Sequence, residues 1–181
     1  MVDIGGGGAP PPPPPGVEGG FGVAFFPIHP PGLQDPEVLY ADKTESGHPI
    51  RANTSVGARA PAYTVATGKA MLAQLPDSYL ERFRPLLKRY TDTTRTTMEA
   101  LREDVELARV QGYASVLHGE WREGIAACAC AILGRDGELV GAIGLSGPDS
   151  RIKRKHLKQY SVDVIEAARS ISTALGYTAR G

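Results

Sequence analysis

Cysteine, net charge and long apolar runs are all scarce in this sequence. Its 181 residues include two cysteines, and its 20 lysines and arginines balance 20 aspartates and glutamates. Two cysteines make no disulfide framework, which favours a reducing compartment, so we expect a cytoplasmic protein. A formal net charge of zero gives no general attraction to nucleic acid or anionic lipid. No run approaches the roughly 20 apolar residues that a membrane-spanning helix needs, and no membrane contact is expected.

The start of the chain lacks the basic and apolar regions of a signal peptide. It is dominated by the glycines of Gly5–Gly8 and the prolines of Pro10–Pro15, which cannot build a packed core. The glycines that follow, up to Gly22, lack the spacing of a nucleotide-binding loop, and we leave them out of the fold. The sequence therefore predicts a disordered Gly/Pro-rich tail over residues 1–36 and one folded domain over residues 37–178.

The remainder of the chain predicts clustered strands and clustered helices. Strands are expected at residues 38–40, 50–56 and 113–117, and in a hairpin made of residues 125–133 and 139–145. Helices are expected from Thr64 to Leu75, from Asp77 up to Pro85, from a Thr96–Glu99 capping box to Gly112, and from Lys153 to Leu175. Strands and helices that cluster in this way indicate an α+β fold, in which helices pack on an antiparallel sheet.

The hairpin is the most informative segment because its strands are rich in small residues. Asp136-Gly137 between two apolar runs is a hairpin signal, since glycine takes a positive φ without a Cβ clash. The small residues are too short to fill a core alone; they are Ala127, Ala129, Ala131, Gly141 and Gly144. They leave room either for a tightly packed helix or for a ligand, and the residues alone favour neither.

The start of the helix at Thr64 is the clearest candidate for a binding site. If Thr64 is the N-cap, the amides of the first turn are unpaired donors, and with the helix dipole they attract a carboxylate or a phosphate. The small residues Ala66 and Gly68 would let a ligand approach the backbone around Thr67. The alternative is an ordinary capped helix without a ligand.

Ser146 ends the second hairpin strand and offers a hydroxyl to a ligand on the concave face of the sheet. It does not form a nucleophile elbow, because Pro148 stands where the G-x-S-x-G motif requires glycine. A hydrolase that combines Ser146 with His156 and Asp163 is a remote alternative. We therefore expect no catalytic residue and no enzyme activity.

Three other features have more than one interpretation. Cys128 and Cys130 share one face of a strand without a second Cys or His pair, which indicates small buried residues rather than a metal site. The basic cluster from Arg151 to Lys158 is either a phosphate-contacting surface or a solvated face. Trp121, the one tryptophan, covers a pocket, lies at a dimer contact or packs on the hairpin. We expect neither a metal nor a cofactor.

Several short motifs in a fixed order extend this picture across residues 37–177. They are VLYADKTES at 38–46, VGARAP at 56–61, ATGKAMLA at 66–73, GYA at 112–114, GEWREGI at 119–125, and SGP at 146–148 followed by SRI at 150–152. Their order and spacing resemble the effector-binding domain of the isocitrate lyase regulator (IclR) family of bacterial transcription regulators. The resemblance implies a GAF-like fold, a curved antiparallel sheet with helices packed on it.

What the resemblance implies about function is sensing rather than catalysis. Family members bind a small organic acid or aromatic metabolite, which alters how a separate winged-helix domain holds operator DNA, and they work as dimers or tetramers. The ligand meets backbone amides at positions matching Ala66 and Thr67, and strand positions matching Ala127, Gly144 and Ser146. Only Ser146 keeps a hydroxyl here. A larger or aromatic carboxylate is therefore expected, rather than an acid of the size of pyruvate or glyoxylate.

The winged helix that family members carry before the position of Glu37 has no counterpart in this sequence. The chain is then a fragment, a truncated gene product or a free-standing sensor that joins full-length regulators, and it is not expected to bind nucleic acid by itself. Because the tail also stands in place of the opening strand of the family domain, the sheet would keep an open edge, and we expect self-association through that edge or the neighbouring helix. The alternative function is an oligomerisation or interaction module that has no ligand of its own.

Overall fold

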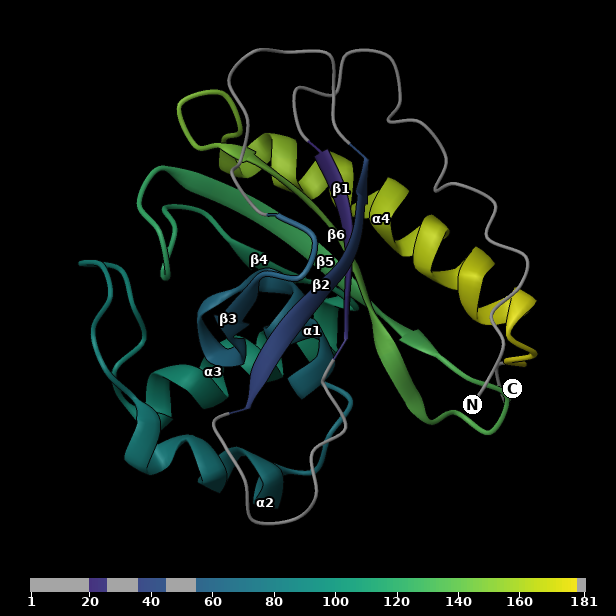
Figure 1. Ribbon diagram of the computed structural model, residues 1–181, viewed down its shortest axis with the longest axis horizontal. Coiled ribbons are helices and arrows are strands. Elements are labelled where there is room, and N and C mark those ends of the chain that lie inside the picture. The colour runs from purple at the N-terminus through teal and green to yellow at the C-terminus, as the bar shows by residue number, and fades with distance from the viewer. Residues whose placement is uncertain (1–19, 26–35, 45–54, 179–181) are drawn as a thin grey trace.

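Six strands form one antiparallel sheet in the order β3-β2-β1-β6-β5-β4 (Figure 1). This computed structural model describes residues 20–25, 36–44 and 55–178. The strands are β1 Gly20–Phe25, β2 Glu37–Thr44, β3 Arg59–Pro61, β4 Ala114–Val116, β5 Ile125–Leu133 and β6 Leu139–Pro148. The α-helices are α1 Ala66–Leu72, α2 Asp77–Leu80, α3 Met98–Gln111 and α4 Arg154–Ala174, with 3-10 helices η1 Ala62–Thr64 and η2 Glu81–Leu86. The predicted α+β fold is confirmed.

The β5–β6 hairpin forms as its Asp-Gly turn predicts, and β6 is one of the two central strands of the sheet. Gly137 adopts φ 81°, the left-handed conformation that the turn requires. Because side chains alternate along a strand, the pairs Ala127–Ser146 and Ala129–Gly144 point to one face, and Cys128 with its partner Leu145 points to the other. The hairpin therefore contributes small residues to one face and larger ones to the other.

The face with the larger residues is covered by α4, which crosses the sheet alone on that side in Figure 1. Leu157, Val164 and Ala168 of α4 are buried there against Cys128 and Ile143, among others. Leu175, the expected end of this helix, is its C-cap residue and is 45% exposed. Both cysteines point to this face, so the prediction that they are small packing residues is confirmed for the buried Cys128.

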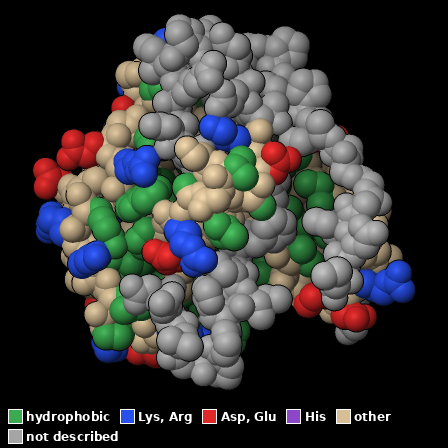
Figure 2. Space-filling view, viewed as in Figure 1, with side chains coloured by type: hydrophobic (Ala, Val, Ile, Leu, Met, Phe, Trp, Pro, Cys, Tyr) green, Lys and Arg blue, Asp and Glu red, His purple; other side chains and the backbone are tan. Residues whose placement is uncertain are grey.

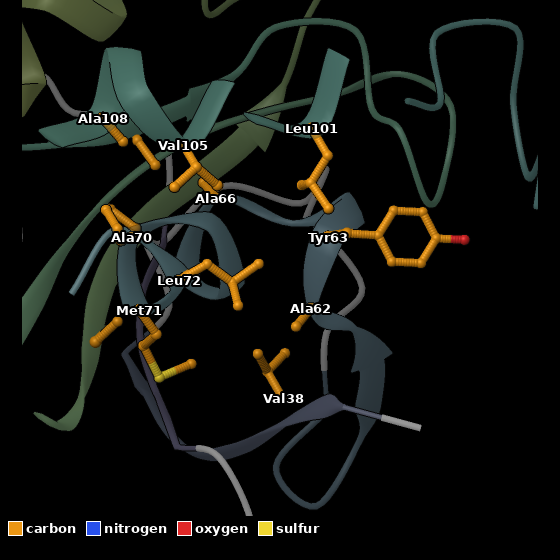
Figure 3. Close-up of a cluster of buried hydrophobic side chains, with 14 of the residues drawn as sticks. Val38, Ala62, Tyr63, Ala66, Ala70, Met71, Leu72, Leu101, Val105 and Ala108 are labelled. Atoms are coloured by element: carbon orange, nitrogen blue, oxygen red, sulfur yellow. The ribbon is translucent and has the colours of Figure 1, made fainter. Parts of the chain in front are cut away.

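The opposite face, with the small residues, is covered by α1, and α3 packs on α1 from outside (Figure 1). Figure 3 shows how the buried side chains of α1 meet those of α3 and β2. Helix α3 ends at Gly112 as predicted, with φ 79°. Its N-cap is Thr97 and not Thr96, because the Thr97 hydroxyl accepts a hydrogen bond from the Ala100 amide at 3.2 Å.

The exclusion of residues 1–36 from the fold is wrong for Gly20–Phe25. These residues form β1, which pairs with β2 on one side and β6 on the other and so lies inside the sheet. Glycine inside a strand weakens the strand, but it also marks places where another part of the chain approaches closely. Gly22 pairs with Gly144, and α1 packs closely on the sheet at Gly144. The predicted open edge at this place is therefore filled, while residues 1–19 and 26–35 lie outside the described part of the chain.

The strand predicted at residues 50–56 falls mostly outside the described residues. Ser55 and Val56 belong to a turn, and the strand that pairs with β2 is β3, Arg59–Pro61. The two edge strands of the sheet, β3 and β4, are three residues long each. Among the described residues, no helix is both long and apolar enough to cross a membrane.

Candidate functional site

The start of α1 differs from the prediction at its N-cap. Val65, in an extended conformation, is the N-cap, and it provides no side-chain hydrogen bond to the helix. Thr64 belongs to the preceding 3-10 helix, where its hydroxyl donates to the carbonyl of Pro61 at 2.7 Å. The threonine hydroxyl therefore closes a turn of its own. The prediction that Thr64 caps the helix is wrong, and α1 begins two residues later.

The absence of a side chain at Gly68 has a packing reason. A Cβ at this position would collide with the backbone carbonyl of Ala62, because α1 folds directly back on η1. The sequence analysis interprets the small size of Gly68 as room for a ligand. In the structure Gly68 faces the backbone of Ala62 instead, and that side of the helix is filled. Ala66 is also buried, within the core cluster on this face of the sheet.

The packing at Gly144 shows what one of the small hairpin residues accommodates. A Cβ placed on Gly144 would lie 3.0 Å from the Ala129 Cβ and 3.1 Å from Cγ2 of Thr67. The space above this glycine is therefore occupied by α1 itself. At Gly144 the small residue accommodates a tightly packed helix, and the expected direct ligand contact at this position is not supported by the packing.

The Thr67 hydroxyl stands out, because it is buried without a hydrogen bond. Thr67 is 7% exposed, and its Oγ1 is one of two buried side-chain oxygens in the described residues that lack a partner. It lies close enough to the phenol of Tyr40 on β2 to act on the pKa of that group. Burial raises the pKa of Tyr40, while the Thr67 hydroxyl and the charge of Arg122 act in the opposite direction. A polar corner thus lies between α1 and β2.

The remaining predicted residues border this corner and are more accessible. Ser146 and Ala127 are register partners on the α1 face, and both are partly exposed. Trp121 is partly buried against the same core cluster as Ala66, Ala127 and Tyr40. The Arg122 guanidinium lies over the indole ring of Trp121, 4.2 Å from its centroid. The border therefore combines an aromatic ring, a cation and a hydroxyl.

A hydrolase arrangement around Ser146 is not assembled. Ser146 lies on the α1 face, whereas His156 and Asp163 belong to α4 on the other side of the sheet. Nδ1 of His156 lies 2.9 Å from the carbonyl of Arg151 and accepts from the amide of Lys153 at 3.2 Å, two roles that suit different ring protonation states. Within the described residues, no group of three or more His, Cys, Asp and Glu could hold a metal ion.

A buried charged cluster that the sequence analysis missed lies on the outer side of α1. Lys69 is 1% exposed, and its ammonium lies 2.5 Å from Oδ2 of Asp104 on α3 and 2.5 Å from Oε1 of Glu120. Arg95 completes the cluster with two hydrogen bonds to Asp104, at 2.9 and 3.0 Å. The four side chains form two positive and two negative groups, so the cluster is electrically balanced.

The two carboxylates of this cluster differ in electrostatic environment. Burial raises the pKa of Glu120, and the attraction of Lys69 offsets only part of that effect. Burial also acts to raise the pKa of Asp104, but Lys69 and Arg95 together outweigh it and leave that pKa lowered. Asp104 has two cationic partners and Glu120 has one, and Oε2 of Glu120 is the second buried oxygen without a partner.

Three threonines of the loop before α3 hold the segment that leads to Trp121. The hydroxyls of Thr91 and Thr93 donate to the carbonyl of Gly119, at 2.8 and 3.1 Å, and that of Thr94 donates to the carbonyl of Glu120 at 2.6 Å. Gly119 adopts φ 67°, where a side chain would collide with the carbonyl of Arg122. The backbone before Trp121 is thus fixed in a tight turn.

The surface charges are mixed. Basic and acidic side chains are interspersed on the face shown in Figure 2, as expected from a formal net charge of zero. In the basic cluster at the start of α4, Lys153 donates to the carbonyl of Asp149 at 2.9 Å, while Arg154, Lys155 and Lys158 are exposed. Exposed basic side chains fit a phosphate-contacting surface and a solvated face alike, so both interpretations stay predictions.

Comparison with known proteins gives one consistent answer. Residues 28–173 match the family model described as bacterial transcriptional regulator IclR C-terminal. The chain is 30% identical over 152 residues to the HTH-type transcriptional regulator KdgR of Escherichia coli K12, covering 83% of this chain and 57% of KdgR. It is 31% identical over 144 residues to the transcriptional repressor IclR of the same strain, covering 78% of this chain and 52% of that protein.

Solved structures agree with the sequence relatives. The structure resembles Thermotoga maritima IclR with a TM-score of 0.77 and 26% identity, covering 88% of this chain and 62% of that one. It resembles the C-terminal domain of Escherichia coli KdgR with a TM-score of 0.72 and 27% identity, covering 89% and 90%. The chain spans about half the length of the curated relatives that it matches. They are named as transcription regulators, which supports the non-enzymatic interpretation.

Proposed function

The chain belongs to the IclR family of bacterial transcription regulators, and we propose that it is the effector-sensing part of such a regulator. In this proposal a small organic acid binds at the start of α1 on the small-residue face of the sheet. The bound acid changes how a DNA-binding partner, or a winged-helix domain of the same protein, controls transcription. The site of action is the cytoplasm, and the working form is a homo-oligomer or a mixed oligomer with full-length regulators.

The observation that carries the proposal is the unpartnered hydroxyl of Thr67. Leaving a buried polar group without a hydrogen bond costs about 1–3 kcal/mol, and native proteins keep few such groups. A ligand that hydrogen-bonds Thr67 Oγ1 would offset this cost. The partly exposed Ser146, Ala127 and Trp121 are the most accessible of the predicted contact residues, and the proposal places the entry of the ligand beside them.

The chemistry of the border favours an aromatic or larger carboxylate. Ala127 and Gly144 supply no polar group, Tyr40 and Trp121 supply aromatic surface, and Arg122 places a positive charge near Tyr40. An aromatic acid would bury its ring against these surfaces, and its carboxylate would meet the cation and the hydroxyls of Thr67 and Ser146. A two- or three-carbon acid would leave the aromatic surface uncovered.

Thermal-shift screening of the whole chain with organic acids tests the proposal. A ligand at about a hundred times its Kd stabilises a fold by about 2.7 kcal/mol, which raises the melting temperature measurably. Benzoate and related aromatic acids are expected to stabilise the protein, and pyruvate and glyoxylate to have little effect. Tight calorimetric binding of a two- or three-carbon acid, with none of the aromatic acids, would contradict the proposed ligand class.

Thr67→Val provides the matched control, because valine keeps the shape of threonine without the hydroxyl. The variant is expected to fold as the wild type does and to lose stabilisation by the aromatic acid. Equal stabilisation of the wild type and of Thr67→Val by the aromatic acid would show that the Thr67 hydroxyl does not contact the ligand.

The second candidate function is an oligomerisation module without a ligand. The filled space above Gly144 favours it, and so do Leu107 and Val110 of α3, which are 55% and 76% exposed. Under this alternative no acid in the screen changes the melting temperature. Light scattering would show a dimer or larger species, which Leu107→Lys with Val110→Lys would convert to monomer.

A further inference from the structure

A buried ion pair joins the two elements that carry the candidate site. Lys69 lies two residues after Thr67 on α1, a rotation that places the two side chains on opposite sides of the helix. Glu120 directly precedes Trp121, whose ring packs against the core near Ala66 and Tyr40. The 2.5 Å contact between Lys69 Nζ and Glu120 Oε1 therefore links the helix that bears the hydroxyl to the loop that bears the indole.

We propose that the Lys69–Glu120 pair is a positioning device, which holds Trp121 at the border of the effector site and thereby sets the affinity for the effector. The consequence for affinity rests on the proposed function. The position of Trp121 does not depend on the proposed function, and it can be measured without any effector.

The pair is poorly explained as a source of stability alone. Two ions taken out of water lose hydration that their mutual attraction often does not restore, so apolar residues of similar size frequently stabilise a core as well or better. Lys69 is nevertheless completely buried and makes both of its ion pairs at 2.5 Å. Some buried charges are kept for the arrangement that they specify, and we infer that role for this pair.

The contacts of the loop show what the pair specifies. The threonine hydroxyls fix the carbonyls of Gly119 and Glu120 to the segment before α3, and these bonds do not involve α1. The ammonium of Lys69 is the contact that ties the Glu120 side chain to α1. Because Glu120 Oε2 has no partner, the side chain has no alternative hydrogen bond to keep it in place once Lys69 is removed.

The same cluster extends the connection from the site to α3. Asp104 shares Lys69 with Glu120 and is held in turn by the two hydrogen bonds of Arg95. A shift of Trp121 on effector binding would therefore act on Asp104 through Lys69. Such a link between a ligand site and a distant helix needs residues with defined partners on both sides, and Lys69 has them.

The test uses the intrinsic fluorescence of Trp121, the one tryptophan in the sequence. The informative protein is the double variant Lys69→Met with Glu120→Gln, which removes both charges and leaves Asp104 paired with Arg95. The matched control is Arg84→Met with Glu81→Gln, which removes an exposed ion pair away from the site, together with the second pair that Glu81 makes with Arg102. Circular dichroism and urea unfolding establish that each protein is folded.

In the double variant, acrylamide is expected to quench Trp121 more strongly and the emission to shift to longer wavelength, while the control matches the wild type. Unchanged quenching and emission in a folded double variant would overturn the proposal, since Trp121 would then hold its place without the pair. If the double variant does not fold, Glu120→Gln alone and the pH titration of the wild type carry the test.

The pH titration separates positioning from a merely structural role. Glu120 faces Lys69 from α1, Asp104 from α3 and Arg95 from the loop before α3, and burial raises its pKa above the ordinary value of 4.5. As the pH falls through the raised pKa of Glu120, protonation of its carboxylate weakens the attraction to Lys69. Quenching of wild-type Trp121 should therefore rise. The step should be missing in the double variant. A flat wild-type profile would count against the proposal.

The effector arm uses benzoate as the probe. The double variant is expected to bind benzoate about 2- to 30-fold more weakly than the wild type, the range of coupling effects transmitted through a neighbouring residue. If quenching changes but benzoate binds neither protein, the positioning of Trp121 stands and the proposed effector class fails. If benzoate binds both proteins equally while quenching changes, the link between the pair and affinity is overturned.

Discussion

Thr67 on α1 packs against Gly144 on β6 so closely that a Cβ on the glycine would lie 3.1 Å from the threonine Cγ2. The same threonine carries a buried hydroxyl without a partner. The methyl group of Thr67 thus fills the space above Gly144, while its hydroxyl oxygen is buried without a hydrogen bond. This arrangement explains why the small residues of the hairpin are consistent with helix packing and with ligand binding at once.

The close packing of α1 predicts an order of stability for two glycine variants. Gly144→Ala would press the new methyl group on Ala129 and Thr67, and overpacking of this kind costs about 1–3 kcal/mol. Gly68→Ala is expected to cost more, because its Cβ would lie 2.0 Å from the backbone oxygen of Ala62, whereas the nearest atoms at Gly144 are 3.0 Å away. Urea unfolding measures both. A gain in stability at position 68, as helix propensity alone predicts, would contradict this packing.

The unpartnered hydroxyl predicts the effect of Thr67→Val on the free protein. Removing a buried polar group that makes no hydrogen bond relieves a desolvation cost of about 1–3 kcal/mol without losing volume. The variant is therefore expected to be as stable as the wild type or more stable in the absence of ligand. A clear loss of stability by urea unfolding would mean that Oγ1 has a partner in solution, such as an ordered water.

Arg109 is predicted to stabilise the end of α1. Its guanidinium on α3 donates to the carbonyl of Ala73 at 3.1 Å and to that of Leu75 at 2.8 Å, just after the helix ends. Losing these charge-assisted bonds in Arg109→Met should cost about 1–3 kcal/mol. Arg84→Met, which loses only an exposed pair with Glu81, should cost less than about 1 kcal/mol. Equal effects of the two substitutions would refute the capping role.

The two cysteines are predicted to resist thiol reagents in the native state. Burial raises the pKa of the Cys128 thiol to about 12, and burial also raises the pKa of Cys130. Since the thiolate is the reactive form, labelling by an aromatic disulfide at pH 8 should be slow in the folded protein. Both thiols should react quickly in urea. Fast labelling of the folded protein would show that the α4 side of the sheet opens readily.

The acid stability of the protein is predicted to depend on Asp104. Lys69 and Arg95 lower the pKa of this carboxylate below its ordinary value of 3.8 against the effect of burial. A lowered pKa contributes stability above 3.8 that is lost as the pH falls through the folded-state value. The urea midpoint of the wild type should therefore fall more steeply below pH 4 than that of Asp104→Asn. Parallel curves would exclude this contribution.

Local patterns in the sequence predicted most of the fold. The Asp136-Gly137 turn, the helix end at Gly112 and the helix expected from Lys153 to Leu175 depend on neighbouring residues, and all three are confirmed. Strand β1 was missed because Gly20 and Gly22 weaken any strand pattern, and their pairing with β6 is a long-range property. Thr64 was chosen as N-cap because of its residue type, but its hydroxyl closes an earlier turn.

The candidate site was predictable only in part, because its geometry depends on contacts far apart in the sequence. The charged cluster joins Lys69 to residues 35 and 51 positions away, and no local spacing reveals such a pair. Tyr40 could have been found, since the alternation of Val38 and Tyr40 places both on the core face of β2. The predicted ligand contacts all stay predictions; they are Ala66, Thr67, Gly68, Ala127, Gly144, Ser146 and Trp121.

The short outermost strands limit how copies of this protein can associate. In the described part of the chain, the edge strands β3 and β4 each offer a strand of a second copy only a few free main-chain donors and acceptors. These are too few for a strong intermolecular ladder. Assembly must then depend on the shape and chemistry of side chains over the helices, which mutation alters readily. Related regulators that share this sheet could thus diverge in their choice of subunit partner while the sheet itself stays the same.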